Sequence, residues 1–129
     1  MVQHGETVVH IVEDDESVRQ SLSRLMRSVG FSSRAYKSAE TFLHEAEVGM
    51  HGCILLDITM SHMNGLELGR QLKAKRIICP IIVVSAIDDE VTRHSARELG
   101  VRFFLRKPVD DQALIDAIAW VMTEQNEIK

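Results

Sequence analysis

A small set of polar side chains in this 129-residue sequence could do chemistry together, because each follows an apolar run. These residues are Glu13, Asp14, Asp15, Asp57, Ser85 and Lys107. Asp57 is the most informative of them, since it closes the apolar run Cys53–Leu56. An unpaired carboxylate taken into an apolar interior is strongly destabilising. Asp57 therefore needs a cation, a hydrogen-bond network or an open edge of the fold.

The acidic residues predict a magnesium site beside Asp57. Neighbouring carboxylates repel one another unless a cation lies among them, and Lys107 supplies only one positive charge. Several carboxylates with room for water suit Mg²⁺, which Asp14 and Asp15 would hold. Ser85 and Lys107 would then contact the oxygens of a phosphoryl group. Asp57 would act as the nucleophile and form an acyl phosphate.

Each residue also has an ordinary structural explanation. Asp14 or Asp15 could simply cap the helix that follows, and Asp57 could cap a turn. Ser85 could be an ordinary hydroxyl at the end of a strand, and a single lysine is usually a solvated charge. The chemical interpretation therefore depends on whether the fold brings all of these residues to one place.

Short apolar runs alternate with helical patterns along the whole chain. Strands are predicted at 7–12, 32–36, 52–57, 80–86 and 102–106. Helices are predicted at 18–29, 39–47, 64–75, 88–100 and 110–125. Gly30 is expected to end the first helix and Ser38 to cap the second, and the helix at 88–100 has the fewest apolar residues. Trp120 lies off the apolar stripe of the last helix, where we expect the edge of the core, with contact to a partner as the alternative.

This alternation predicts one doubly wound α/β domain with a five-stranded parallel sheet and helices on both faces. Continuous apolar strands are typical of sheets that are covered on both sides. Ligands bind such sheets at the carboxyl ends of the strands. All the polar residues named above fall at that edge, which is the strongest argument that they act together.

Composition excludes several classes of function. A net charge of −4 and a pI near 5.8 argue against direct nucleic-acid binding by this chain. The sequence has no run of about 20 apolar residues and no signal-peptide pattern at its start, so we expect a cytoplasmic protein without membrane contact. Cys53 and Cys79 lack the spacing of a disulfide or zinc site and are expected to be small core residues.

Four motifs resemble the receiver domain of bacterial two-component response regulators. They are "VEDD", "LLDITM" with a following "NG", "VVSA" and "FLRKP", and the resemblance extends from about Val8 to Met122. It implies a flavodoxin-like fold with strand order 2-1-3-4-5 and a single receiver domain over 1–129, whose core is about 8–122. The last two motifs resemble nitrogen-fixation-type transcriptional regulators, whose helix-turn-helix output domain is absent from this chain. A stand-alone regulator remains the alternative.

The resemblance implies that a sensor histidine kinase transfers a phosphoryl group to Asp57. It further implies that Mg²⁺ is bound by Asp15, Asp57 and the backbone carbonyl of Thr59, and by Asp14 through water. Ser85 and Lys107 would contact the phosphoryl group. The chain would catalyse only its own phosphorylation and dephosphorylation, so we do not expect a conventional enzyme.

The resemblance also implies a switch. Ser85 would turn toward the phosphoryl group, Phe104 would turn inward, and the Lys107–Pro108 peptide bond would be cis. The surface formed by the helix at 88–100, the strand at 102–106 and the helix at 110–125 would respond, through a phosphorylation-dependent homodimer. The output would be control of transcription.

The sequence departs from the family at three positions. Ser61 stands where the family usually has proline, so the loop after Asp57 is less stiff. Thr59 and Ile87 occupy the two positions that tune loss of the phosphoryl group, and neither can position an attacking water as a carboxylate or amide would. We therefore expect a long-lived phosphorylated state.

Two further functions fit the same fold. A flavodoxin-type binding module would use the same edge of the sheet, but the sequence lacks a glycine-rich phosphate loop, and the acidic residues would repel a phosphate. A phosphate-ester hydrolase with an aspartate nucleophile would need a second acid two residues after Asp57, where Thr59 stands.

Overall fold

Five parallel strands form one sheet in this computed structural model, which describes residues 8–57, 65–87, 89–98 and 100–127. The strands are β1 Val8–Val12, β2 Ser33–Tyr36, β3 Gly52–Asp57, β4 Ile81–Ser85 and β5 Phe103–Arg106. The helices are α1 Glu16–Ser28, α2 Ala39–Glu45, α3 Gly65–Ala74, α4 Glu90–Glu98 and α5 Asp111–Glu127. The sheet order is β2-β1-β3-β4-β5, which confirms the predicted fold.

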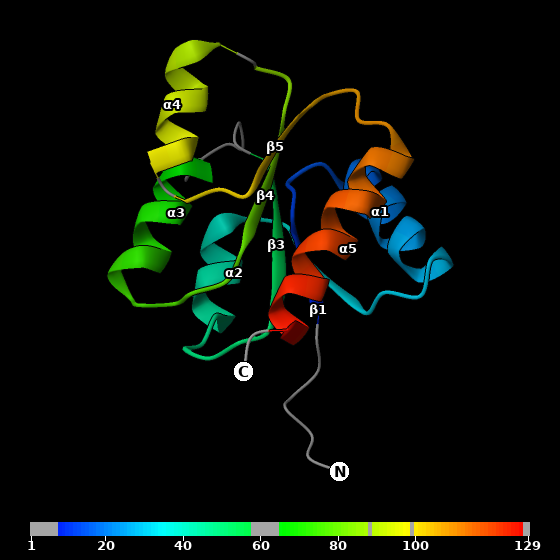
Figure 1. The fold of residues 1–129 in the computed structure, drawn as a ribbon, viewed down its shortest axis with the longest axis horizontal. Coiled ribbons are helices and arrows are strands. Elements are labelled where there is room, and N and C mark those ends of the chain that lie inside the picture. The colour runs from blue at the N-terminus through cyan, green and yellow to red at the C-terminus, as the bar shows by residue number, and fades with distance from the viewer. Residues whose placement is uncertain (1–7, 58–64, 88, 99, 128–129) are drawn as a thin grey trace.

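The helices cover both faces of the sheet, with α1 and α5 on one side and α2, α3 and α4 on the other (Figure 1). Every residue of β1, β3 and β4 is buried. Because successive strand residues point to opposite faces, each strand contributes to both halves of the core. Val9 and Ile11 pack on the α1 and α5 side, whereas Val12 packs on the opposite side. Burial on both faces thus explains the continuous apolar runs in the sequence.

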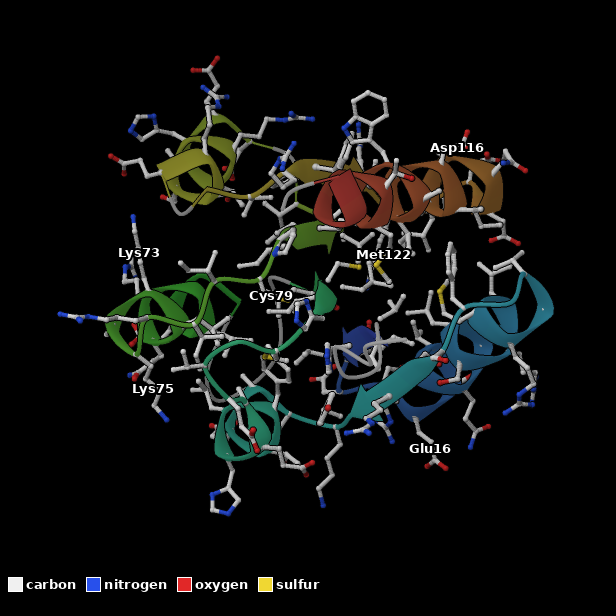
Figure 2. The ribbon with its side chains drawn as sticks, turned by 60° about the horizontal axis from the view of Figure 1, so that its bottom comes forward. Glu16, Lys73, Lys75, Cys79, Asp116 and Met122 are labelled. Carbon is white, nitrogen blue, oxygen red and sulfur yellow. The ribbon has the colours of Figure 1, made fainter. Side chains whose placement is uncertain are left out.

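The helices have one apolar stripe each, as the spacing of their residues predicts. Figure 2 shows Met122 pointing from α5 toward the sheet, while Lys73 and Asp116 point away from it. Ser38 accepts a hydrogen bond from the backbone N–H of Thr41, which confirms it as the cap of α2. Gly30 follows α1 with a φ of 87°, a left-handed conformation that favours glycine and ends a helix.

Three apolar residues of helical segments are exposed. Val29 follows α1 as its C-terminal cap and is 41% exposed. Val91 is 76% exposed, so that Ala96 is the buried residue of α4 among those described. Trp120 is 59% exposed, so the expectation that it packs at the edge of the core is wrong. With Val91 exposed, α4 contributes few apolar side chains to the core, in line with its sparse apolar pattern.

The two cysteines are buried and unpaired, as expected of small core residues. Burial raises the pKa of each thiol to about 12, so both stay protonated near neutral pH. Among the helices that the structure describes, none is long and apolar enough to cross a membrane.

Candidate functional site

Asp57 stands at the carboxyl end of β3, the central strand of the sheet. It is only 5% exposed, and its position along the strand is fixed by pairing with Val84 of β4. On the other side of β3, Leu56 pairs with Val12, so the acidic residues that follow β1 reach the same edge. The strand pairing therefore brings Asp57 and the residues after β1 together, as the sequence predicts.

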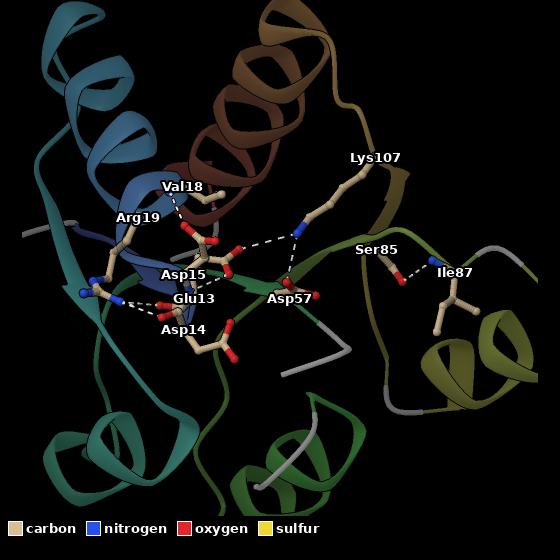
Figure 3. A network of polar contacts seen from close by, with 9 residues as sticks. All are labelled: Glu13, Asp14, Asp15, Val18, Arg19, Asp57, Ser85, Ile87 and Lys107. Carbon is tan, nitrogen blue, oxygen red and sulfur yellow. Dashed lines mark hydrogen bonds and ion pairs between the residues drawn. The ribbon is translucent and has the colours of Figure 1, made fainter. Parts of the chain in front are cut away.

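Lys107 provides the positive charge next to Asp57. Its Nζ donates a 2.9 Å hydrogen bond to Asp57 Oδ2 and lies 3.6 Å from Glu13 Oε1 (Figure 3). Burial disfavours the charge of Lys107, but the hydrogen bond and charge of Asp57, with Glu13, outweigh it and raise the lysine pKa. Lys107 thus stays protonated and connects the carboxyl end of β3 with that of β1.

The acidic cluster at this edge consists of Glu13, Asp14 and Asp57. One oxygen from each carboxylate lies within 4.8 Å of the others. Glu13 is only 3% exposed, and its Oε1 has no hydrogen-bond partner among the described residues. Burial raises the pKa of Glu13, and the charge of Asp57 adds to this effect.

These three side chains fit a hard divalent cation. Buried polar atoms are normally hydrogen-bonded. Glu13 Oε1 lies 3.6 Å from the Lys107 ammonium but has no hydrogen-bond partner among the described residues, so a cation or water would complete its contacts. Carboxylate oxygens are the ligands that Mg²⁺ prefers. Three carboxylates opposed by one ammonium also leave an excess of negative charge that such an ion would offset.

Asp15, which the sequence suggests as a metal ligand, is not among the three carboxylates that lie together in the described part of the chain. Asp15 is the N-cap of α1, and its Oδ1 accepts a 3.0 Å hydrogen bond from the backbone N–H of Val18 (Figure 3). The cap occupies one of the two carboxylate oxygens of Asp15. Glu13, which the sequence places after the first strand but does not suggest as a metal ligand, takes part in the cluster instead. The sequence does hold a signal for this assignment. An acid directly before the first residue of a helix is usually its cap, so Glu13 and Asp14 are the acids that remain for the site.

Arg19 shapes the loop that carries these acids. Its Nη1 donates to the backbone carbonyls of Glu13 at 2.9 Å and Asp14 at 3.3 Å (Figure 3). In turn, Glu13 Oε2 accepts a 3.1 Å hydrogen bond from the backbone N–H of Asp15. These contacts hold the acidic side chains in place and were not predicted from the sequence.

Ser85 is fully buried at the end of β4. Its Oγ accepts a 2.9 Å hydrogen bond from the backbone N–H of Ile87 (Figure 3). Phe104 lies on β5, where it is half-buried against the core between the sheet and α4. The Lys107–Pro108 peptide bond is cis, as the resemblance implies. Thr59 and Ser61, on which sequence expectations also rest, lie outside the described residues.

Comparison with known proteins agrees with this geometry. The profile of the response regulator receiver domain matches residues 9–119. The chain is 37% identical to response regulator protein TodT of Pseudomonas putida F1 over 112 residues, which cover 87% of this chain and 49% of TodT. It is also 37% identical to transcriptional regulatory protein FixJ of Rhizobium meliloti over 110 residues, 85% of this chain and 54% of FixJ.

A solved structure of the response regulator StyR superposes with a TM-score of 0.88 at 38% identity, covering 95% of this chain and 62% of StyR. The chain thus spans about half the length of the curated relatives that it matches. The matched residues include both acidic segments, β4 and the Lys107 segment, so the family resemblance is confirmed along the sheet edge that carries the site. The chain therefore belongs to the response regulator receiver domain family.

Proposed function

We propose that this chain is a phosphorylation-activated receiver that accepts a phosphoryl group on Asp57 from a sensor histidine kinase. The observation that carries the proposal is the position of Asp57, buried at the end of the central strand between Lys107 and two further carboxylates. A nucleophile held by a fully buried strand loses little conformational freedom on reaction. We expect this exchange to take place in the cytoplasm.

The reaction is a transfer between two nucleophiles. An Asp57 carboxylate oxygen attacks phosphorus, the O–P bond of an acyl phosphate forms, and the P–N bond to the donor histidine breaks. The imidazole leaves and takes up a proton. The role of this chain is to orient the carboxylate and to neutralise charge on the phosphoryl oxygens, since phosphoryl transfer depends mainly on positioning and electrostatics.

Lys107 and Ser85 are the groups that would contact the phosphoryl oxygens. Lys107 already donates to Asp57, so its ammonium group needs only to shift from the carboxylate to the new oxygens. Ser85 would have to give up its hydrogen bond from Ile87 to turn its hydroxyl toward Asp57. That exchange links the chemistry on β3 to the backbone at the start of the β4–α4 loop.

Mg²⁺ is the cation that we propose for the acidic cluster. Glu13, Asp14 and Asp57 would hold it, directly or through water, together with the backbone carbonyl of Thr59 that the family resemblance implies. When bound, the ion would offset the charge of the carboxylates and of the incoming phosphoryl oxygens.

The output is the second part of the proposal. Because the curated relatives include a transcriptional regulator twice as long as the matched region, we propose that this receiver controls a DNA-binding output domain. Phosphorylation would act through the surface formed by α4, β5 and α5, where exposed Ile87, Val91 and Trp120 favour a homodimer. A stand-alone regulator that uses the same surface is the alternative.

Beryllofluoride, a phosphoryl mimic, tests the phosphoacceptor role. We expect binding monitored by amide NMR to require Mg²⁺ and to shift resonances at Ser85 and Lys107. Asp57→Asn should abolish it, because the amide is a poor ligand for beryllium, whereas Asp116→Asn, on the outer face of α5, should not. Binding without Mg²⁺, or equal binding by the Asp57→Asn variant, would contradict the proposal.

A further inference from the structure

Arg93 makes a specific contact between α4 and β5. Its guanidinium carbon lies 4.8 Å from the centroid of the Phe104 ring, within the range of a cation–π interaction. Among the described residues of α4, Ala96 is the buried one and its side chain is small. The contact of the half-buried Arg93 with Phe104 is therefore one of the contacts that hold α4 against the sheet.

Phe104 lies where a change at Ser85 can reach it. Val83 pairs with Phe104 across β4 and β5, and Ser85 stands two residues further along β4, on the same face as Val83. Phe104 packs against the core between the sheet and α4, where Ser85 is fully buried. If the Ser85 side chain turns toward Asp57, it leaves space on the face that the Phe104 ring adjoins.

We propose that Arg93 is a positioning residue that holds Phe104 in its resting arrangement and thereby sets how readily phosphorylation switches the α4–β5 face. The inference rests on the proposed phosphoacceptor function. A cation–π contact requires the guanidinium to lie over the ring face, so an inward turn of Phe104 removes it. Arg93 thus stabilises the resting state alone, and a contact present in only one of two states shifts their populations.

The surroundings of Phe104 supply a matched control. Arg93, Arg97 and Arg102 line a cavity of about 210 Å³ together with Ala96, Val101 and Phe104. Arg97 carries the same charge as Arg93 and lines the same cavity. The cation–π contact with the Phe104 ring is made by Arg93. If the positive charge of the cavity alone matters, removing either arginine should alter the switch. If the position of Phe104 matters, removing Arg93 should alter it and removing Arg97 should not.

The experiment is a double-mutant cycle of Arg93→Ala and Phe104→Leu, read by the beryllofluoride concentration at half-saturation in constant Mg²⁺. Arg93→Ala should lower this concentration roughly two- to fivefold, the size of an exposed cation–π contact. It should also raise the rate of phosphorylation by acetyl phosphate. In the Phe104→Leu background the same substitution should have a smaller effect on both values. The difference between the two backgrounds isolates the contact with Phe104, because other contacts of Arg93 cancel in that difference. Arg97→Ala should leave both values unchanged, and Arg93→Lys should be intermediate.

Equal effects of Arg93→Ala in the two backgrounds, or equal effects of Arg93→Ala and Arg97→Ala, would overturn the proposal. Thermal unfolding followed by circular dichroism shows whether each variant is folded. If Arg93→Ala fails to fold, Arg93→Lys is compared in the Phe104 and Phe104→Leu backgrounds instead. A wild-type protein that does not bind beryllofluoride with Mg²⁺ would instead contradict the phosphoacceptor function, so the two failures are distinguishable.

Discussion

Lys107 is the residue on which the resting site depends. It lies between two buried carboxylates, and its ammonium contacts Asp57 more closely than Glu13. Removing one member of a buried ion pair leaves an uncompensated charge, which is more destabilising than the pair is stabilising. We expect the same ammonium to contact the phosphoryl oxygens when Asp57 becomes phosphorylated. The contact with Asp57 that stabilises the resting site is therefore also the one that changes in the reaction.

We expect single residues, Thr59 and Ile87, to set the lifetime of the proposed phosphorylated state. Ile87 is 43% exposed two residues after Ser85 and offers no group that could orient an attacking water. We expect the paired substitutions Thr59→Asn and Ile87→Glu to accelerate loss of the phosphoryl group about tenfold, since a carboxylate and an amide can position water for attack. Intact-protein mass spectrometry of phosphorylated protein over time measures the rate.

The control for this lifetime is Ile78→Glu, which places the same charge on another exposed isoleucine, just before β4 and away from the site. It should leave the rate unchanged. A rate that the paired substitutions leave unchanged or slower would refute the explanation based on positioning of water.

At the scale of the elements, β3 fits tightly against β1 at its start. Gly52 pairs with Val8 and has a φ of 114°, a backbone conformation that side chains rarely adopt. A Cβ built at Gly52 would lie 1.8 Å from the carbonyl oxygen of Val8, which is backbone and cannot move aside easily. This glycine lets β3 enter the sheet in the register that carries Asp57 to the acidic cluster.

We therefore expect Gly52→Ala to lower the free energy of unfolding by about 3 kcal/mol or more, because it combines strain with a backbone clash. Gly100→Ala is the matched control, since Gly100 also has a positive φ, of 80°, but has open space where a Cβ would be. Gly100→Ala should lower the free energy of unfolding by about 1 kcal/mol. Urea unfolding compares the two variants, and equal losses of stability would show that the contact with Val8 is unimportant.

At the scale of the whole molecule, one patch of exposed apolar surface lies beside β5, an edge strand of the sheet. Trp120 is exposed on α5, beside a hollow of about 580 Å³ that Phe103, Leu105 and Ala117 help to line. Because β5 is an edge strand, α4 and α5 lie at the same edge of the sheet, on its opposite faces (Figure 1). Exposed aromatic residues next to apolar hollows are typical of protein interfaces.

We expect beryllofluoride with Mg²⁺ to shift the chain from monomer toward dimer, measured by sedimentation equilibrium. Trp120→Gln should weaken the dimer on the order of tenfold, as expected for an aromatic residue at the centre of an interface. Val48→Gln, which removes an exposed valine from the loop after α2, should leave it unchanged. A monomer in every condition, or equal effects of the two substitutions, would place the partner surface elsewhere.

Much of this fold could be predicted because its signals are local. Runs such as Cys53–Leu56 are apolar at every position, which only a strand covered on both faces requires. Once the order of strands and helices is known, the edge that collects Asp57, Ser85 and Lys107 follows from the rule that parallel strands end together. The fold class and the neighbourhood of the site are thus properties of the sequence alone.

Only the tertiary structure shows which acid caps α1 and which acids lie beside Asp57. The sequence predicts the first helix from residue 18, whereas α1 begins at Glu16. This boundary makes Asp15 the cap of the helix, while Glu13 is buried at the end of β1. The exposure of Trp120 and the stacking of Arg93 on Phe104 likewise depend on how helices pack across the sheet. Such contacts join residues that are far apart in the chain. The sequence does not reveal them because many side-chain arrangements satisfy the local pattern, and only the close packing of the whole fold selects one of them.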